Sequence, residues 1–579
     1  MFLATTADQR FWNADGKTLF LGNWCKVYDQ ERIWSALDHE VLPYHWDDRS
    51  RLHEDYKYLN ELYERVLDNL TDELNKLHNV EHSTRYWRIV VGPWIYYFLQ
   101  ILYDRYLSIS SAIQSGKVKH TSLPADLAGV VPDDLHCLMS WSSGDEYNLF
   151  LYSQLYKDLG GSGYEEVNIP LRLNRPEIKA STFGKYTLLK IASSLCKMVP
   201  DSLNKIVFIT SYIKPKELFR LQVSLGQIPY FSINEVKMKP PAMDESMRSQ
   251  IEIPTGKNQF ESILPTWINQ QIPKVYIEGY SSMVRMARKA YPQKPKVIIT
   301  ASALIGNEGF KVWAGENVEK GAKLVGTQHG GAHGIARWSA NETHEIKVTD
   351  RFFTWGWKDP DDQTTVPLAS SRLSSGGDEI KNNPSGRILW TGFSIPRYSY
   401  WLYSSPVGPQ YLDSIGEQKS FLKSVSPGVR KLLLMRLHPT ERGWHENYMW
   451  QHLDLSLEVY RGTKSNAEQL NASRLSIGTY NGMGILETLS ANYPTIIFWN
   501  PNHWELRESA KPAFDVLLGA GIFHETPQSA AFKVNEVYQD VQSWWMSVET
   551  QRARKIFCDQ FCNTSKPLIR LKEELLKLL

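Results

Sequence analysis

The chain has 579 residues, enough for two or more domains that each bury a core, which excludes a peptide hormone, a disulfide scaffold and a lone binding module. Lysine and arginine (65) nearly balance aspartate and glutamate (63), and a net charge of +2 predicts no nucleic-acid partner. Hydrophobic residues make up 42% of the sequence, which indicates a folded protein. Aromatic residues make up 12%, and they are expected to fill a large core or to form amphipathic surfaces such as sugar-stacking clefts and membrane interfaces.

The N-terminus and the cysteines predict a cytoplasmic protein. Asp8 and Arg10 interrupt the short apolar run that a secretory signal would have to extend. The longest apolar run, residues 89–102, is shorter than the roughly 20 residues of a membrane span. The cysteines have neither the spacing of a zinc site nor the pattern of a disulfide framework: Cys25, Cys137, Cys196, Cys558 and Cys562.

The N-terminal third combines a sheet with long helices. Residues 1–6 and 18–21 are predicted to form two strands about a turn at residues 13–16. Leucine and valine recur at steps of three and four through residues 52–77, the pattern of an amphipathic helix. Further helices are expected at about residues 93–114 and 140–159. Residues about 50–160 therefore read as a helical insertion in the first domain.

From about residue 205 onward, short β-branched runs alternate with helical stretches. Such runs indicate parallel strands covered on both faces, so the predicted fold class is α/β. We expect a Rossmann-like N-terminal domain over residues 1–355, a second Rossmann-like domain over 356–545, and C-terminal helices over 546–579 that pack back on the first domain. The predicted strands are 205–210, 295–300, 322–326, 387–390, 431–435, 475–478 and 494–498.

The first candidate motif is a glycine-rich loop, Gly-Thr-Gln-His-Gly-Gly-Ala-His-Gly, at residues 326–334 directly after a predicted strand. Its glycines allow close backbone approach, and Gln328, His329 and His333 supply polar groups beside Gly330 and Gly331, so the loop is suited to hold a ligand. The alternative is a purely structural role, in which the segment is a tight turn and the histidines stabilise it.

Two further motifs follow strands of the second domain. Arg436 and His438 alternate along a strand that Pro439 ends, so both should point the same way and converge on one anion such as a phosphate. The alternative is a surface arginine and a capping histidine. The third motif runs from strand to helix at residues 478–489, where the first-turn amides form an anion site. Its candidate ligand-binding residues are Tyr480, Asn481, Gly482 and Glu487, although an ordinary strand-to-helix junction has the same pattern.

Together the three motifs resemble GT-B glycosyltransferases, in particular bacterial enzymes that use CMP-activated ulosonic or nonulosonic acids such as Kdo or sialic-acid-like sugars. Residues 436–439 resemble their His-Pro motif, and residues 479–494 resemble their donor-binding helix, with Asn492-Tyr493 where a glycine is common. Residues 328–331 resemble the Gln-His-Gly loop of capsule and teichoic-acid transferases. The whole layout resembles a family of transferases found with bacterial surface-polysaccharide genes, and the resemblance covers about residues 295–512.

The resemblance implies transfer from a CMP-sugar donor to a glycan or glycolipid acceptor. Donor contacts would come from Gln328, Gly330, Gly331 and the second-domain residues, without metal or cofactor, because no Asp pair of the metal-binding type stands at a strand end. Candidates for the general base are Glu308, His329 and His333, with Glu308 preferred, and His438 completes the catalytic set. Asp145 and Glu146 are further candidates for the base.

Three alternatives remain at this point. The donor could be a UDP- or GDP-sugar, the protein could be a sugar-nucleotide epimerase, or it could be a non-catalytic glycan-binding scaffold. Aromatic residues of 86–106 and basic residues of the last helices could attach the protein peripherally to the inner face of the cytoplasmic membrane. Rings that flank the motifs are candidates for stacking on a sugar: Trp313, Trp338, Trp355, Trp357, Trp390, Trp499 and Trp504.

Overall fold

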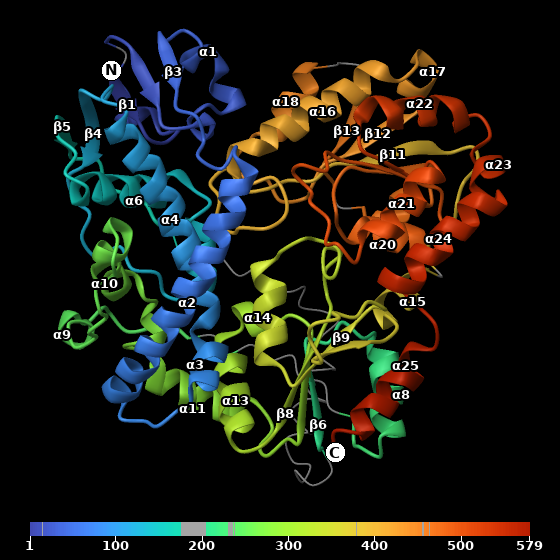
Figure 1. The fold of residues 1–579 in the computed structure, drawn as a ribbon, viewed down its shortest axis with the longest axis horizontal. Helices are drawn as coiled ribbons and strands as arrows, with labels where there is room; N and C mark the ends of the chain where they lie inside the picture. The colour runs from blue at the N-terminus through green and yellow to red at the C-terminus, as the bar shows by residue number, and fades with distance from the viewer. Residues whose placement is uncertain are drawn as a thin grey trace.

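The computed structural model describes residues 1–13, 15–174, 204–229, 236, 238–377, 379–453, 457–462 and 464–579, so Cys196 lies outside the described residues. These residues form three sheets in which every strand pair is parallel (Figure 1). The predicted α/β class with parallel sheets is confirmed. The stretch predicted as one N-terminal domain, residues 1–355, holds one whole sheet and four of the five strands of a second.

Sheet 1 has the order β3-β2-β1-β4-β5. Its first two strands pair in parallel, Phe2 opposite Thr18, so the expected pair about a turn is not a hairpin. The strands are β1 (Phe2–Ala4), β2 (Thr18–Phe20), β3 (His39–Val41), β4 (His120–Pro124) and β5 (Tyr164–Val167). The helices are α1 (Glu31–Trp34), α2 (Arg49–His78), α3 (Thr84–Val90), α4 (Gly92–Gln114), α5 (Leu135–Trp141) and α6 (Asp145–Asp158).

Helix α2 agrees with the helix predicted from leucine spacing. Its N-cap is Asp48, whose carboxylate accepts hydrogen bonds from the amides of Ser50 and Arg51. It ends where Asn79 adopts a left-handed conformation, φ 51°. Helices α2 to α4 lie between sheets 1 and 2 in the view of Figure 1 and join the two sheets in one hydrophobic core.

Sheet 2 has the order β10-β9-β8-β7-β6. Its strands are β6 (Ile206–Ile209), β7 (Val297–Thr300), β8 (Lys323–Thr327), β9 (Arg351–Thr354) and β10 (Thr365–Pro367). The last of them lies beyond residue 355. Its helices are α8 (Pro215–Ser224), α9 (Glu245–Arg248), α10 (Gln259–Gln271), α11 (Tyr280–Ala290), α12 (Ala303–Gly306), α13 (Glu308–Glu319), α14 (Ala340–Val348) and α15 (Ser371–Gly377).

Sheet 3 has the order β13-β12-β11-β14-β15-β16, which is the Rossmann order 3-2-1-4-5-6. Its strands are β11 (Arg387–Thr391), β12 (Leu433–Arg436), β13 (Glu458–Tyr460), β14 (Ser473–Gly478), β15 (Thr495–Phe498) and β16 (Phe523–His524). Its helices are α16 (Tyr411–Ser424), α17 (Pro427–Arg430), α18 (Glu446–Leu453), α19 (Asn466–Leu470), α20 (Met483–Ser490), α21 (Lys511–Gly519), α22 (Pro527–Val537) and α23 (Val541–Trp545).

The C-terminal helices divide between two sheets. Helix α24 (Val548–Phe561) packs on α20 and α21 of sheet 3, whereas α25 (Pro567–Leu576) packs on α8 of sheet 2. Leu571 and Leu575 of α25 belong to the core cluster that contains Ile206 and Phe208 of β6. The chain end therefore returns to sheet 2 (Figure 1).

One ion pair and two hydrogen bonds join the chain after β11 to the part of the chain around sheet 1. Arg397, which follows β11, is 4% exposed, donates to the carbonyl of Trp24 (2.7 Å) and pairs with Asp145 at the start of α6. Tyr398 donates to the same carboxylate at 2.6 Å. Asp145, one of the candidate bases, is thus a structural partner that holds the chain after β11 on sheet 1.

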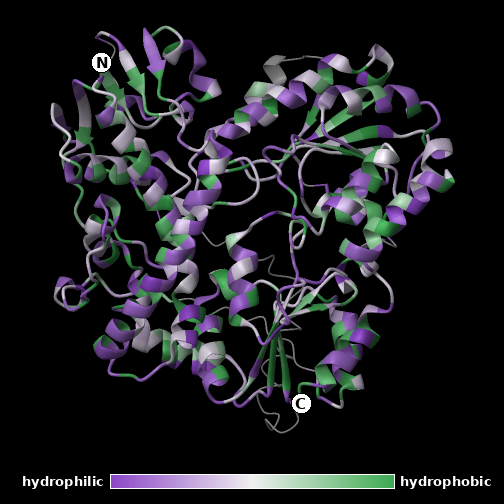
Figure 2. Cartoon of the chain, in the orientation of Figure 1, coloured by the Kyte–Doolittle hydropathy of each residue, from purple (hydrophilic) through white to green (hydrophobic). Residues whose placement is uncertain are grey.

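The aromatic residues lie mostly inside the protein. Trp87, Trp94 and Phe98, from the segment predicted to contact a membrane, are at most 1% exposed, so that prediction was wrong for these rings. The rings proposed to stack on a sugar are also buried, from 0% for Trp390 to 8% for Trp504. Figure 2 shows the same pattern, with hydrophobic strands inside the molecule. Within the described residues, no helix combines the length and the apolar character needed to cross a membrane.

Candidate functional site

The glycine-rich loop after β8 and the loop after β14 meet directly. A Cβ atom placed on Gly331 would lie 2.3 Å from the carbonyl carbon of Gly482 and 2.6 Å from the amide nitrogen of Met483. Only a residue without a side chain allows this approach. We call residues 326–334 and 478–483 the loop junction. It brings together two motifs that are about 150 residues apart in the sequence, at the carboxyl ends of strands in sheets 2 and 3.

Glu345 of α14 holds both histidines of the first loop. Its carboxylate oxygens lie 2.8 Å from Nε2 of His329 and 3.2 Å from Nε2 of His333. The Glu345 side chain is fully buried. Burial raises the pKa of Glu345, but the two histidines outweigh burial and hold that pKa at about 2. We call His329, His333 and Glu345 the Glu345 clamp.

The two histidines of the clamp differ in what they can do. His333 is buried, and its ring also bonds the carbonyl of Gly330. Burial lowers the pKa of His333, but Glu345 raises it by more, so the pKa lies above that of a free histidine. The His329 side chain is 21% exposed, and no described residue bonds its Nδ1. His329 can therefore accept a proton at Nδ1 while Glu345 orients the ring through Nε2.

Gln328 builds the loop. Its Oε1 accepts hydrogen bonds from the amide of Trp355 (2.9 Å) and from Nε1 of Trp357 (2.8 Å), while its Nε2 donates to the carbonyl of Gly330 (3.0 Å). The side chain is 3% exposed. Its amide is committed to these partners, so the contribution of Gln328 is to shape the loop that carries His329.

Arg372 of α15 is a cation at the junction that the sequence patterns did not identify. Its Nη1 donates to the carbonyl of His329 at 3.3 Å, and its guanidinium lies 5.2 Å from the ring centre of Tyr212. A cavity of about 40 Å³ borders Arg372, Tyr212 and Gln328. Arg372 lies in a segment rich in serine and glycine that contains none of the three motifs, so only the fold reveals its position.

Three predicted donor-binding residues gather beside α20. Burial raises the pKa of Tyr480, with the charge of Glu487 adding to this effect and that of Arg436 opposing it, so all three groups are close enough to interact. Burial also raises the pKa of Glu487, against a hydrogen bond from Asn466 (3.2 Å) and the charge of Arg372. The charges of Arg436 and Arg372 thus act on groups in α20 or just before it.

The N-terminus of α20 presents its own donors at this place. Gly482 is its N-cap, and no side chain caps the helix. The first-turn amides therefore remain available for an anion, in the field of the helix dipole. Asn481, 9% exposed, precedes this turn. The helix start is therefore a candidate site for a phosphate, and the charges of Arg436 and Arg372 act on Tyr480 and Glu487 beside it.

Arg436 and His438 do not converge in this structure. Arg436 is directed to the start of α19, where it donates to Gln469 and to the carbonyl of Lys464 (3.0 Å). The ring of His438 lies against Thr440, with Nδ1 3.1 Å from its amide nitrogen, and burial lowers the pKa of His438. Strand alternation sets the initial direction of a side chain, whereas these partners decide where its end lies.

Glu308, the preferred base, is in the core instead. It is 8% exposed, pairs with Lys311 at 2.9 Å and accepts a hydrogen bond from Tyr276 at 3.0 Å. Lys311 is fully buried, and burial raises the pKa of Glu308. Because the carboxylate compensates a buried ammonium group, its role is structural and we do not assign it to the reaction centre.

The donor atoms of the Glu345 clamp lie within 4.8 Å of one another, and two histidines with a carboxylate are ligands that divalent metals accept. Both histidine–carboxylate distances are also those of hydrogen bonds. Metal-independent chemistry therefore stays a prediction, and a chelation experiment described below tests it.

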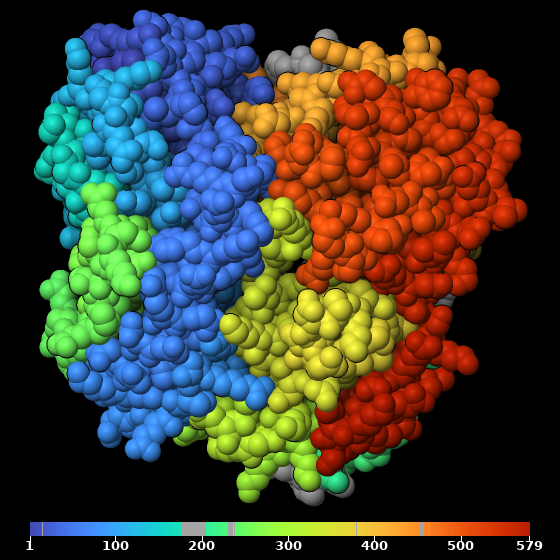
Figure 3. Space-filling model, viewed as in Figure 1, coloured from blue at the N-terminus to red at the C-terminus, as the bar shows by residue number. Residues whose placement is uncertain are grey.

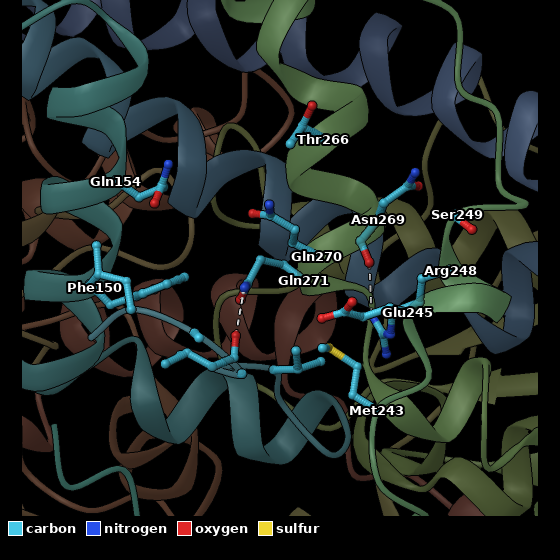
Figure 4. Close-up of a pocket in the computed structure, with 15 residues that line it drawn as sticks. Phe150, Gln154, Met243, Glu245, Arg248, Ser249, Thr266, Asn269, Gln270 and Gln271 are labelled. Atoms are coloured by element: carbon cyan, nitrogen blue, oxygen red, sulfur yellow. Dashed lines mark hydrogen bonds between the residues drawn. The ribbon is translucent and has the colours of Figure 1, made fainter. Parts of the chain in front are cut away.

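A cavity of about 600 Å³ lies away from the junction (Figure 4). Phe150 and Gln154 of α6 face Asn269 and Gln271 of α10 across it, and none of the predicted site residues lines it. The amide of Gln271 already donates to the carbonyl of Val130 at 2.7 Å. Volume alone does not identify the candidate site, because the two loops that carry the sequence motifs meet elsewhere, at the loop junction.

Comparison with known proteins finds solved structures of low similarity to this chain and one family model that matches its sequence. No curated protein matches the sequence. MurG of Acinetobacter baumannii is 11% identical over 68% of this chain and 97% of that protein, with a TM-score of 0.30. The rhamnosyltransferase SpnG with spinosyn aglycone is 12% identical over 51% of this chain and 79% of that protein, with a TM-score of 0.28. The catalytic domain of starch synthase IV from Arabidopsis thaliana, bound to ADP and acarbose, is 9% identical over 51% of this chain and 76% of that domain, also with a TM-score of 0.28.

The model of the LIC12162 family transferase matches residues 1–576, nearly the whole length, and includes the loop junction and all three sheets. The chain belongs to the LIC12162 family of transferases.

Proposed function

We propose that this transferase is a GT-B glycosyltransferase that moves an ulosonic or nonulosonic acid, of the Kdo or sialic-acid type, from a CMP donor to a growing bacterial surface glycan. The observation that carries the proposal is the contact of Gly331 with Gly482 and Met483. The contact brings the loop that carries His329, whose ring Glu345 orients, next to the start of α20, where no side chain caps the helix. A base and a phosphate site side by side are what glycosyl transfer requires.

In the proposed reaction, Nδ1 of His329 takes the proton of the acceptor hydroxyl. The acceptor oxygen bonds to the anomeric carbon, the bond from that carbon to the phosphate oxygen breaks, and CMP leaves with the bonding electrons. Glu345 stabilises the imidazolium that forms on His329, since its negative charge lies 2.8 Å away. The first-turn amides of α20 and Arg436 stabilise the charge that develops on the leaving phosphate.

Arg372 supports the choice of an acidic sugar. An ulosonic acid carries a carboxylate next to its anomeric carbon, and a guanidinium binds a carboxylate through two parallel hydrogen bonds. Arg372 is anchored by one nitrogen to the carbonyl of His329, so its remaining donors lie beside the proposed base. A neutral hexose from UDP or GDP has no carboxylate on its sugar, so only the diphosphate could pair with this arginine.

A nucleotide panel tests the donor. CMP should raise the melting temperature more than UMP, UDP or GDP, because a ligand that binds the folded state stabilises it. Arg436→Ala and Arg372→Ala should weaken the CMP effect, whereas Arg10→Ala, a surface change at sheet 1, should not. Preferential stabilisation by UDP or GDP would replace the CMP donor with a neutral one.

Product analysis then separates the remaining functions. Transfer requires both donor and acceptor, and the product is a glycan extended by one residue together with CMP. An epimerised or free nucleotide sugar formed without acceptor would indicate an epimerase. Binding of CMP with no turnover in the presence of any surface-glycan acceptor would indicate the scaffold function, which the transferase family makes the less favoured alternative.

A further inference from the structure

Helices α8 and α25 form the outer layer on one face of sheet 2. Leu218 and Leu221 of α8 and Leu571 and Leu575 of α25 join one core cluster with side chains of β6, β7, β8 and β9, and the two helices contact each other (Figure 1). Because both helices bury one side against the same face of the sheet, their opposite sides point toward the same solvent-facing surface. We call this surface the α8–α25 face. Helix α25, in red, lies at the molecular surface at the lower right of Figure 3.

Large apolar side chains are exposed on the α8–α25 face. Phe219 and Val223 lie one helical turn apart on α8, and Ile569 and Leu576 lie two turns apart on α25, so each pair follows one side of its helix. Their exposed fractions run from 47% for Leu576 to 57% for Ile569, and Leu579 adds a further exposed side chain. Apolar residues at such spacings normally face a core. Gathered on the outside, they indicate a contact surface.

The same two helices carry the positive charge of the chain. Residues 215–224 and 566–579 contain six lysines and arginines but three glutamates, a net charge of +3, whereas the whole chain has +2. Lys577 is paired with Glu574, but among the residues that the structure describes, Lys216, Arg220 and Arg570 form no ion pair. All three of these side chains belong to exposed residues. Their charges are therefore available to an anionic partner.

We propose that the α8–α25 face docks on an anionic lipid bilayer. Apolar side chains flanked by lysine and arginine suit such a bilayer, because the apolar groups enter the boundary between headgroups and acyl chains while the cations meet the lipid phosphates. A protein partner suits the face less well, since lysine is depleted at protein interfaces. The basic last helices expected to contact a membrane thus keep that role, with α8 in place of residues 86–106.

The α8–α25 face also adjoins the loop junction. Pro567 and Leu571 of α25 line the same cavity as Arg372 and Gln328. Docking on a bilayer would therefore bring the junction close to the membrane. The proposal itself concerns binding to lipid and does not depend on the identity of the donor or on turnover.

Vesicle flotation of the full chain, without nucleotide or acceptor, tests the proposal. The two probes are vesicles of phosphatidylcholine alone and vesicles that also contain phosphatidylglycerol. The protein should bind the anionic vesicles at least about tenfold more tightly than the neutral ones, because several cations meet a negative surface. A high concentration of sodium chloride should release it, since salt screens exposed charges.

Paired variants with lost charge test the cations. Arg220→Gln combined with Arg570→Gln should weaken binding to the anionic vesicles at least about tenfold, because two of the groups that meet the phosphates are removed. Lys431→Gln combined with Arg552→Gln is the matched control. It removes the same charge from exposed residues next to α17 and on α24, and it should leave vesicle binding unchanged.

Paired variants with lost apolar surface test the other half of the face. Phe219→Ser combined with Ile569→Ser should also weaken binding at least about tenfold, because less apolar surface enters the bilayer. Phe532→Ser combined with Val548→Ser is the matched control, since these side chains are 72% and 86% exposed outside the face. All four positions are exposed, so both variants should keep the melting temperature of the wild type.

The proposal is overturned if the wild type binds neither kind of vesicle, if it binds both equally, or if both α8–α25 variants bind as the wild type does. Light scattering at several protein concentrations completes the test. A dimer that forms in the wild type and is lost in Phe219→Ser combined with Ile569→Ser, without any vesicle binding, would overturn the proposal and assign the face to a second copy of the chain.

Discussion

Glu345→Gln tests the assignment of the base most directly. The amide keeps the shape of the carboxylate but removes the charge that lies 2.8 Å from His329 and 3.2 Å from His333. We expect kcat to fall by about 10²- to 10⁴-fold, the usual contribution of a positioned base, because the imidazolium formed on His329 loses its stabilising partner. His329→Ala should cause a loss of the same size.

Glu345→Gln should also lower the free energy of unfolding, by an amount that follows from the pKa of Glu345. Bringing the pKa of Glu345 from its ordinary 4.5 to about 2 corresponds to about 3 kcal/mol of stabilisation at neutral pH. The folded pKa is depressed, so this contribution is present above about pH 4.5 and is lost as the pH falls toward about 2. The difference between wild type and Glu345→Gln in urea unfolding should therefore be about 3 kcal/mol at about pH 7 and smaller at about pH 3.

The decisive assay is the double variant. If Glu345 acts through His329, the variant with both changes should lose no more activity than either alone, measured as kcat for the donor that the nucleotide panel selects. Glu308→Gln is the comparison, because it breaks a buried ion pair and should lower stability while folded enzyme keeps its kcat. Additive losses in the double variant, or a large kcat loss in Glu308→Gln, would refute the assignment.

The remaining predictions concern the junction, the domain contact and metals. Gly331→Ala should weaken CMP binding at least about tenfold, because the added Cβ would overlap the backbone of Gly482. Gly484→Ala should leave CMP binding unchanged, because no atom lies within 4 Å of its added carbon. Calorimetry measures CMP binding to both variants. Arg397→Met should lower the unfolding free energy by about 2 to 4 kcal/mol and Arg10→Met by less than about 1, as denaturant unfolding would show. Chelation with EDTA should leave transfer unchanged; a loss that Zn²⁺ restores would instead place a metal in the Glu345 clamp.

The sequence predicted the elements that depend on local spacing. Leucine steps predicted α2, and β-branched runs predicted seven strands, from β6 to β15. These patterns are local because the side that a residue shows to the core follows from helix or strand periodicity. The structure revealed four further strands in sheets 2 and 3. Strands β10, β13 and β16 have only two or three residues, and β9, Arg-Phe-Phe-Thr, has no run of β-branched residues.

Of the candidate site, the sequence alone determined the two loops, because glycines beside polar residues after a strand are visible in one short segment. Only the tertiary structure decided that Gly331 rests on Gly482, that Glu345 and Arg372 join His329, and that Glu308 lies in the core. The physical reason is that each of these contacts joins residues on different elements, whose meeting depends on how three sheets pack. Local periodicity sets which face of an element is buried, while the packing of those faces selects the partners.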